Sequence, residues 1–418
     1  MTRRAIAAIV RVAARIFFRR IELAGLERVP ADSPVIFAVN HPNALIDPLF
    51  LLSFAPRPVS FLAKAPLFRT PLIRWFVRAF DSIPVYRKQD AAQTGVSAPQ
   101  GNRETFAQAR AVLQRGGAIA IFPEGTTHSD PRLRELKTGA ARIALGAGIR
   151  VSIVPTGLYY TSKQTFRSSA LAYFGAPIDV EPEPVDENAE PNPESVERLT
   201  DRIDAALDEV TLQADSHDAL ELIARAERVF SAGKQRDLAE ELELRRRFVA
   251  GYAYLRERDP ARLARLESQV TRMDAAVEPA RVDATTLRRL LLLPIAIIGA
   301  VIHWPLYRLI GLIANYLSRR EREMVATIKI IGGLVLYPLF WIAIAIFAGR
   351  YRAAYAVVAL LLLPLLGYVA LLTLEALDET IGHLRASRHR DTESERTELR
   401  EEIIAIAAEI SAKSTSSS

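Results

Sequence analysis

The chain has 418 residues, a net charge of +6 and no cysteine; half of its residues are hydrophobic and 24% are charged. The length predicts more than one structural unit, and the missing cysteine excludes disulfides, thiolate nucleophiles and cysteine-bound metals. A mild basic excess in so apolar a chain fits an anionic lipid surface better than nucleic acid. We therefore expect an anionic phospholipid membrane as a partner, and no nucleic acid.

Residues 1–20 are expected to form an amphipathic helix at the membrane surface. One side of its helical wheel is basic and the other is apolar, through Arg4, Arg11, Arg15 and Arg19 against Ile6, Ile9, Ala13, Ile16 and Phe17. A basic stripe opposite an apolar face suits the lipid headgroup region. The alternative is a helix that packs on its own domain and leaves its arginines in water. Because arginines interrupt each apolar run, we do not expect a signal peptide.

Residues 21–185 alternate short apolar runs with helical stretches. Six runs rich in Val, Ile, Phe and Tyr are strand candidates: VIFAVN, VSFLAK, IPVYR, GAIAIFPEG, VSIVPTGLYY (expected to end at Pro155) and LAYFGAPIDV. Helices are expected between them, two of them closed by glycines. This alternation predicts an α/β domain with a mostly parallel central sheet flanked by helices.

Residues 186–285 begin with a linker rich in proline and acidic residues, and continue as a charged helical region in which we see no chemistry. Residues 286–378 form the expected membrane region. Its segments 328–348 and 354–374 are each apolar and long enough to cross about 30 Å of hydrocarbon. Residues 379–418 are expected to be a cytoplasmic helical tail with a disordered end.

The earlier apolar segment, residues 290–317, is interrupted by His303-Trp304-Pro305 and by Arg308. Arginines flank both of its ends. Because the cytoplasmic flanks of membrane segments are usually the basic ones, both ends are expected on one side. We therefore favour a broken, re-entrant or interfacial helix over a full crossing. The expected location is the cytoplasmic membrane, with the catalytic domain facing the cytoplasm.

A first candidate catalytic pair lies where an apolar strand meets an apolar helix, at His41 and Asp47. Histidine is the usual general base near neutral pH, and a carboxylate on its other ring nitrogen fixes the tautomer and stabilises the imidazolium. Residues six apart lie about 120° apart on a regular helix. The two can meet if His41 lies in the turn before the helix and Asp47 within it, with Pro42 in the first helical turn. The alternative is an Asn-His-Pro turn beside an ordinary surface aspartate.

A second candidate is the Phe-Pro-Glu-Gly turn that follows another apolar strand. Glu124 stands at the carboxyl end of that strand, where open parallel sheets bind ligands. Gly125 permits close backbone approach, and Lys137 begins a helix that can meet an anion. An ordinary strand–turn–helix is the alternative. His128 and Asp130 raise the question of a metal, but no other histidine lies nearby in sequence and cysteine is absent, so we expect none.

Two arginines are candidate anion contacts. Arg87 ends a short predicted strand, and its planar guanidinium can hold a phosphate. Arg167, in the stretch TFRSSALAYFGAPIDV, is the weaker candidate. For each of them the alternative is a solvated arginine.

The order of these motifs resembles the glycerophospholipid acyltransferase superfamily, which includes the 1-acylglycerol-3-phosphate (lysophosphatidate) and glycerol-3-phosphate acyltransferases. The motifs are Asn-His…Asp, a strand with arginine, Phe-Pro-Glu-Gly and Val-Pro…Gly, over residues 20–180. Five residues separate the histidine from the aspartate where the superfamily more often has four, and Thr127 replaces the arginine of Phe-Pro-Glu-Gly-Thr-Arg. Both departures are similar to the fungal-type glycerol-3-phosphate acyltransferase branch and its bacterial relatives. Lys137 or Arg132 can replace the missing arginine.

The resemblance implies a membrane-bound O-acyltransferase with the glycerol-phosphate acyltransferase fold. His41, oriented by Asp47, is expected to deprotonate a hydroxyl that attacks the thioester of acyl-CoA or acyl carrier protein, with no cofactor besides this co-substrate. Acceptor positioning is assigned to Arg87, Glu124, Gly125 and Lys137. The expected acceptor is 1-acylglycerol-3-phosphate, which gives phosphatidate; glycerol-3-phosphate or another lysophospholipid is the alternative. A non-catalytic membrane scaffold and an esterase are weaker alternatives.

Overall fold

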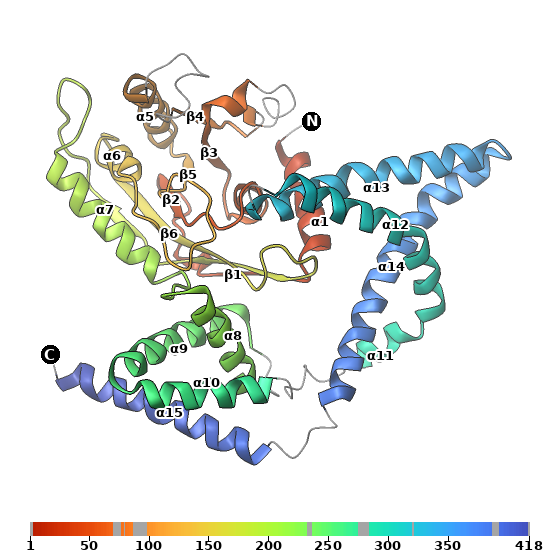
Figure 1. The fold of residues 1–418 in the computed structure, drawn as a ribbon. Helices are drawn as coiled ribbons and strands as arrows, with labels where there is room; N and C mark the ends of the chain where they lie inside the picture. The colour runs from red at the N-terminus through yellow and green to blue at the C-terminus, as the bar shows by residue number, and fades with distance from the viewer. Residues whose placement is uncertain are drawn as a thin grey trace. The chain divides into compact units, whose positions relative to one another are not determined.

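The computed structural model describes residues 3–69, 77–78, 80–86, 98–231, 236–274, 284–319, 322–386 and 393–416 (Figure 1). The chain divides into two compact units. The first unit contains Met1–Leu212 and Glu321–Thr327, and the second contains Gln213–Arg320 and Ile328–Ser418.

One eight-stranded sheet forms the centre of the first unit. Its strands are β1 (Arg20–Ala24), β2 (Val35–Val39), β3 (Val59–Lys64), β4 (Ile83–Val85), β5 (Ala118–Ile121), β6 (Val151–Tyr160), β7 (Ser169–Phe174) and β8 (Ile178–Val180). They lie in the order β1-β7-β6-β2-β5-β3-β4, with β8 also beside β6. Only the pairs of β6 with β7 and β8 are antiparallel among the described strands. The predicted mostly parallel α/β fold is confirmed.

The central strands β2, β5 and β6 are buried along their whole length. Their sequences are continuous apolar runs because both faces of a parallel sheet are covered. The prediction that β6 ends at Pro155 is wrong. One edge of β6 pairs with β8 up to Ile153 and with β7 from Thr156 onward, so Pro155 lies between the two ladders, where the missing N–H costs little.

The described part of this unit also contains the helices α1 (Arg3–Phe17), α2 (Ile46–Phe54), α5 (Ala98–Gln114), α6 (Gly139–Leu145) and α7 (Pro193–Asp208), which flank the sheet. Helix α7 begins where the Asn192 side chain accepts the N–H of Glu194 at 2.9 Å. Its apolar stripe joins the main core beneath the sheet, through Val196, Leu199, Ile203 and Leu207. The first unit therefore ends at Leu212, beyond the predicted boundary at residue 185.

Helix α1 has two apolar faces. One packs against α2, where Ile6 and Val10 join a buried cluster with Leu49 and Phe80. The predicted single lipid-facing apolar side is therefore wrong, because part of it belongs to the core of this unit. A second apolar stripe, made by Ile9, Val12 and Ile16, stays exposed beside the arginines. Contact between this stripe and lipid remains a prediction.

The second unit contains a helical bundle made from segments on either side of the membrane region. Its helices are α8 (His217–Ser231), α9 (Leu238–Arg258), α10 (Pro260–Asp274) and α15 (Glu393–Ser416). Leu399 and Ile406 of α15 are buried in one core with residues of the other three helices. Arg262 pairs with Glu402 at 3.1 Å and with Glu409 at 3.0 Å. The tail therefore folds back onto the charged helical region.

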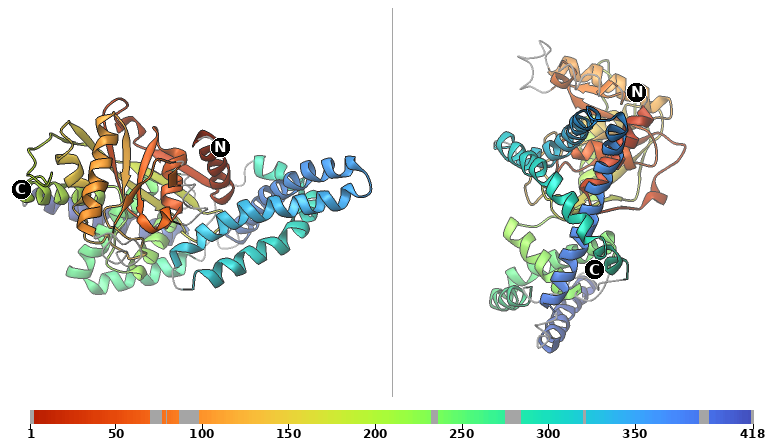
Figure 2. Two further views of the ribbon diagram at one scale, coloured as in Figure 1. Left: turned by 90° about the horizontal axis from the view of Figure 1, so that it is seen from above. Right: turned by 90° about the vertical axis from the view of Figure 1, so that its right-hand side faces the viewer.

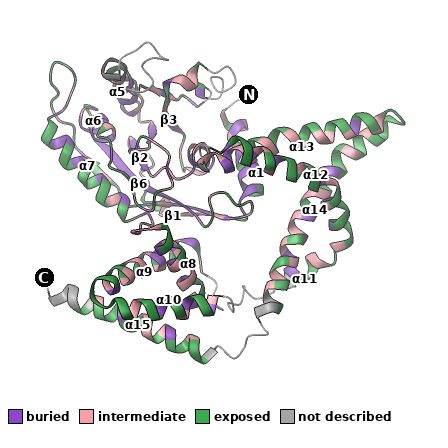
Figure 3. Cartoon of the chain, in the orientation of Figure 1, coloured by how far each residue is buried: buried purple, intermediate pink, exposed green. Residues whose placement is uncertain are grey.

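Among the described residues, three helices are long and apolar enough to cross a membrane: α12 (Leu293–Leu317), α13 (Val325–Gly349) and α14 (Ala353–Ala386). Large apolar side chains stay exposed along them, which is the reverse of the sheet (Figure 3). Helices α13 and α14 meet at a short turn, as predicted (Figure 2). The predicted break in α12 is not present, since the helix continues through Pro305. The short helix α11 (Ala284–Leu290) precedes it.

Candidate active site

The candidate site lies at the carboxyl ends of three adjacent strands. Strand β2 is paired in parallel with both β5 and β6, so the segments that follow the three strands emerge at one edge of the sheet. His41 follows β2, Glu124 follows β5, and Tyr160 ends β6. Asn40 ties two of these ends together, because its amide group exchanges hydrogen bonds with the backbone of Leu158 at 2.7 and 3.1 Å. This is the edge at which open α/β sheets bind ligands.

His41 and Asp47 form the predicted pair. The Nδ1 atom of His41 lies 2.8 Å from Oδ2 of Asp47. His41 stands in the irregular segment before α2, and Asp47 is in the first turn of that helix, as the spacing required. The prediction for Pro42 is wrong, because α2 begins only at Ile46. The side chain of Asp47 has no exposed surface, whereas that of His41 is 15% exposed.

The carboxylate of Asp47 is held by three donors. Besides the imidazole, it accepts the backbone N–H of Asn43 at 2.7 Å and the hydroxyl of Tyr160 at 2.8 Å. Burial and the nearby charge of Asp47 raise the pKa of Tyr160 well above its ordinary value, so the phenol keeps the proton that it donates. Tyr160 is far from Asp47 in sequence, and no local signal could have identified it.

This arrangement fixes the chemistry of the His41 ring. An ionised carboxylate only accepts hydrogen bonds, so Nδ1 carries the proton that is donated to Asp47. The other ring nitrogen, Nε2, then has its lone pair available to take a proton. The ring also stacks on Phe122, with centroids 4.2 Å apart, which limits its rotation. The His41 ring thus has the arrangement that a general base requires.

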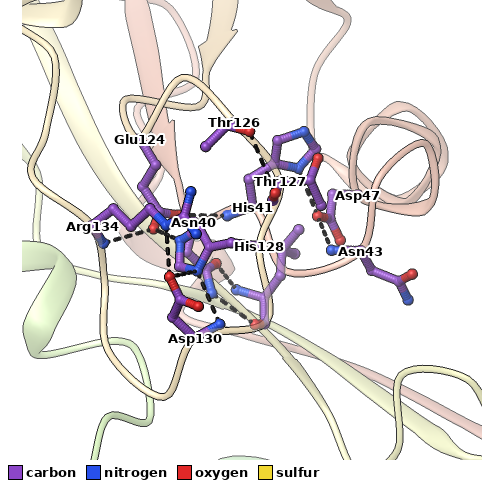
Figure 4. A network of polar contacts seen from close by, with 11 residues as sticks. Asn40, His41, Asn43, Asp47, Glu124, Thr126, Thr127, His128, Asp130 and Arg134 are labelled. Carbon is purple, nitrogen blue, oxygen red and sulfur yellow. Dashed lines mark hydrogen bonds and ion pairs between the residues drawn. The ribbon is translucent and has the colours of Figure 1, made fainter. Parts of the chain in front are cut away.

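Glu124 supports the turn that carries His41 (Figure 4). Its Oε1 accepts the backbone N–H of His41 at 2.9 Å, and its Oε2 accepts the N–H of Arg134 at 3.0 Å and is bonded to His128. Burial alone would raise the pKa of Glu124, but the hydrogen bonds from His128 and from these two backbone groups outweigh it and lower the pKa. The buried carboxylate of Glu124 thus fixes the turn that carries His41. Its contact with an acceptor stays a prediction.

His128 is a buried part of the same network. The backbone N–H of Asp130 donates to its Nδ1 at 3.2 Å, which places the proton of the neutral ring on Nε2, facing Glu124. Its own backbone N–H lies 3.4 Å from the carbonyl of His41. The backbone of His41 is therefore held at two points: its N–H donates to Glu124, and its carbonyl accepts the N–H of His128.

The predicted anion contacts have different outcomes. Arg87 lies outside the described residues. Lys137 is exposed, and its stem lies close to Gly125, which has a positive φ of 71° that favours glycine. Arg167 instead donates to the carbonyls of Arg15 and Ile16 at 3.0 Å each, and so holds the end of α1. The structure thus gives Arg167 a structural contact where substrate binding was predicted.

Lys163 is a cation at this site that the sequence did not reveal. Its backbone carbonyl accepts the side-chain amide of Asn43 at 3.2 Å. Burial lowers the pKa of its half-buried ammonium, and the charges of four nearby carboxylates oppose that shift: Asp47, Glu323, Glu124 and Asp130. A single lysine in a polar loop carries no sequence signature. Only the fold places it beside His41 and Asp47.

Comparison with known proteins agrees with this geometry. The acyltransferase family model matches residues 20–159, which contain the strands and turns that carry His41, Asp47 and Glu124. The chain therefore contains a domain that matches the acyltransferase family. Its acyltransferase domain accounts for the predicted motif order and for the pair at the sheet edge.

Individual relatives match the chain to different extents. It is 28% identical over 283 residues to glycerol-3-phosphate O-acyltransferase 2 of Saccharomyces cerevisiae, over 59% of this chain and 38% of that protein. It is 30% identical over 147 residues to the chloroplastic 1-acyl-sn-glycerol-3-phosphate acyltransferase LPAT1 of Arabidopsis thaliana, over 35% of this chain and 38% of that protein. The chain thus spans about two fifths of the length of each.

A solved structure also matches. It is the crystal structure of the 1-acyl-sn-glycerophosphate acyltransferase PlsC from Thermotoga maritima, with 21% sequence identity and a TM-score of 0.37. The match covers 50% of this chain and 78% of that one.

Proposed function

We propose that the protein transfers a fatty acyl group from a thioester donor to a hydroxyl group of a glycerol phosphate. The observation that carries this proposal is the contact of His41 Nδ1 with the fully buried Asp47, which leaves Nε2 as a base at the carboxyl edge of the sheet. A base is what such a transfer requires, because the thioester is already activated and the alcohol is not.

In the proposed reaction, His41 Nε2 takes the proton from the acceptor hydroxyl as its oxygen attacks the thioester carbon. The C–O bond forms and the tetrahedral intermediate collapses with cleavage of the C–S bond. The imidazolium, stabilised by Asp47, returns the proton to the leaving thiolate. No acyl-enzyme forms and no metal or other cofactor takes part, so a chain without cysteine suffices.

For the acceptor, we propose glycerol-3-phosphate ahead of 1-acylglycerol-3-phosphate. The support is the extent of the match, which reaches 59% and 78% of this chain for two yeast glycerol-3-phosphate acyltransferases. The 1-acylglycerol-3-phosphate acyltransferases match only about a third of it. Arg87, Lys137 and Lys163 are the cations we propose for the acceptor phosphate. Acyl-CoA and acyl carrier protein both remain candidate donors.

Replacing the base tests the function. His41→Ala should lower the rate of acyl transfer at least a thousandfold, because general-base catalysis and the bound geometry are both lost. The measurement is product formation by detergent-purified protein with each acceptor and each donor, with and without a chelator. His217→Ala, which changes an exposed histidine of α8, is the matched control and should keep the full rate. Near-normal turnover of the His41 variant would remove the mechanism.

The exposed apolar helices support attachment to a membrane. We further propose the cytoplasmic membrane as the location, with the acyltransferase domain on the cytoplasmic side. The support is the arginines at both flanks of the membrane region, Arg288 and Arg289 before it and Arg388 and Arg390 after it.

A further inference from the structure

Helix α12 has the length of a membrane span, but its neighbours place both of its ends at the same end of the α13–α14 hairpin. Near its start, the Thr286 hydroxyl of α11 lies 3.5 Å from Glu379, in the polar last part of α14. Further along, a Cβ atom on Gly299 would meet the carbonyl of Leu366, so α12 lies tightly on α14. Toward its end, the Ile310 side chain lies 3.3 Å from where a Cβ atom on Gly332, in the early part of α13, would be.

These contacts show that α12 follows an unusual path along the hairpin. The end of α14 and the start of α13 form the open end of the hairpin, opposite the turn at residues 350–352. Helix α12 therefore enters beside the open end and leaves toward it, and Figure 1 shows it bridging the two arms of the hairpin. A third crossing helix would instead connect the open end to the turn.

The segment that follows α12 gives an independent indication. Glu321–Thr327 belongs to the first unit. The carboxylate of Glu323 in this segment lies near enough to Lys163 and Arg134 of that unit to interact with their charges. The end of α12 is therefore linked to the face of the membrane on which the acyltransferase domain lies. The start of α12 follows α11, which contacts the polar last part of α14 at the same end of the hairpin.

The helical bundle of the second unit limits the number of membrane crossings. Helix α15 shares a core with α8, α9 and α10, so the two ends of the membrane region lie on one face. The link at residues 387–392 reaches about 25 Å when fully extended, which is too short to cross hydrocarbon about 30 Å thick. An even number of crossings is required between α10 and α15, and three candidate helices cannot all cross.

The side chains of α12 indicate which helix does not cross. Arg308 lies near the middle of the helix, with its guanidinium over the Trp304 ring at 5.8 Å, and Arg319 lies over Tyr316 at 4.9 Å. Arginine with Trp or Tyr is typical of the lipid–water interface, and a mid-helix arginine is costly at the bilayer centre. Helices α13 and α14 are more apolar than α12.

We propose that α12 lies in one leaflet of the membrane, on the side of the acyltransferase domain, and that only α13 and α14 cross. Its lipid-facing surface is the exposed apolar set Leu291, Ile295, Ile298, Val301 and Leu312. The lipid partner is thus a single leaflet beside the active-site unit. This inference is independent of the reaction proposed above.

The absence of native cysteine makes the test direct. Single cysteines are introduced in the full chain at exposed positions: Glu221→Cys in α8, Thr285→Cys before α12, Arg319→Cys after it, and Tyr351→Cys in the hairpin turn. Sealed membrane vesicles of both orientations are treated with a membrane-impermeant maleimide. The first three cysteines should label from one face, at least tenfold more than from the other, and Tyr351→Cys should label from the opposite face.

Two results would overturn the proposal. Labelling of Thr285→Cys and Arg319→Cys from opposite faces would show that α12 crosses, and labelling of Tyr351→Cys with the other three would show that the hairpin does not. Asn315→Cys keeps every arginine and should behave as Arg319→Cys does, which excludes an effect of the lost charge. Labelling after detergent solubilisation confirms that each thiol is reactive. None of these outcomes depends on acyl-transfer activity.

Discussion

The acyltransferase domain and the helices α12–α14 use the same kinds of residue in opposite ways. In the domain, apolar side chains are inside, and the buried carboxylates of Asp47 and Glu124 are each held by three donors. In α12–α14 the apolar side chains are largely outside. There the buried His303 is bonded to Gly299 and Trp341 at 2.8 and 3.0 Å. The buried carboxylates of the domain hold the turn and the ring of His41, whereas His303 joins two helices.

Among variants of these buried polar groups, the largest loss of acyl-transfer rate is expected at Asp47. Asp47→Asn should lower the acyl-transfer rate roughly a thousandfold, because an amide NH₂ must face one of three donors and the His41 tautomer is no longer fixed. Tyr160→Phe is the matched control, since it removes one donor and leaves the carboxylate, and should cost severalfold at most. The measurement is kcat at saturating acceptor, with thermal unfolding as a check on the fold. Comparable rates for Asp47→Asn and the native chain would show that the carboxylate is only structural.

A smaller effect on rate is expected at His128, which acts on His41 through Glu124. His128→Phe keeps a ring of similar size but leaves the buried carboxylate without that donor, so we expect kcat to fall about 10- to 100-fold with little change in KM. His128→Gln places an N–H near the position of Nε2 and should recover most of the loss. Failure of the glutamine variant to recover activity, with its unfolding temperature intact, would contradict the positioning role.

The sequence predicted the parts of this site that are local. His41 and Asp47 meet because six residues join a turn to the first turn of a helix, and this spacing can be read directly. The roles of Glu124 and Arg167 could not be read, because which groups engage a carboxylate or a guanidinium is decided by residues far along the chain. Tyr160 and Lys163 were missed for the same reason.

The prediction of strands, helices and unit boundaries was limited in a similar way. Apolar runs identified the buried strands, because a covered parallel sheet needs no alternation. The unit boundary was placed too early, since the proline-rich stretch before Pro193 resembles a linker although α7 packs on the sheet. Pro305 suggested a break in α12, but neighbouring helices can accommodate a proline within a membrane helix.

Acidification should also affect the stability of the acyltransferase domain and of α12–α14 differently. The folded pKa of Glu124 is below its ordinary value of 4.5, so its carboxylate stabilises the fold above that pH, and this stability is lost as the pH falls through the lowered value. Residues 293–317, 325–349 and 353–374 contain no carboxylate. Lowering the pH from 7 to 3 in detergent should therefore remove the near-ultraviolet signal of the domain while helical circular dichroism from α12–α14 persists. A Glu124→Gln variant should lose less stability over this range, and an unchanged pH dependence in it would assign the acid sensitivity to other groups.

The smallest expected effect is at the contact between α12 and α13. His303 accepts the indole N–H of Trp341, and its own Nδ1–H donates to the carbonyl of Gly299, so the neutral ring is fully satisfied. Hydrogen bonds between membrane helices contribute about 0.6 kcal/mol on average, because the separated helices find other partners in the membrane. A double-mutant cycle of His303→Leu and Trp341→Phe, measured by unfolding in mixed micelles, should give a coupling of about this size, with acyl transfer by the intact domain unchanged. A coupling of several kcal/mol, or loss of activity in the double variant, would show that the domain depends on this contact and that the two regions do not use their buried polar groups separately.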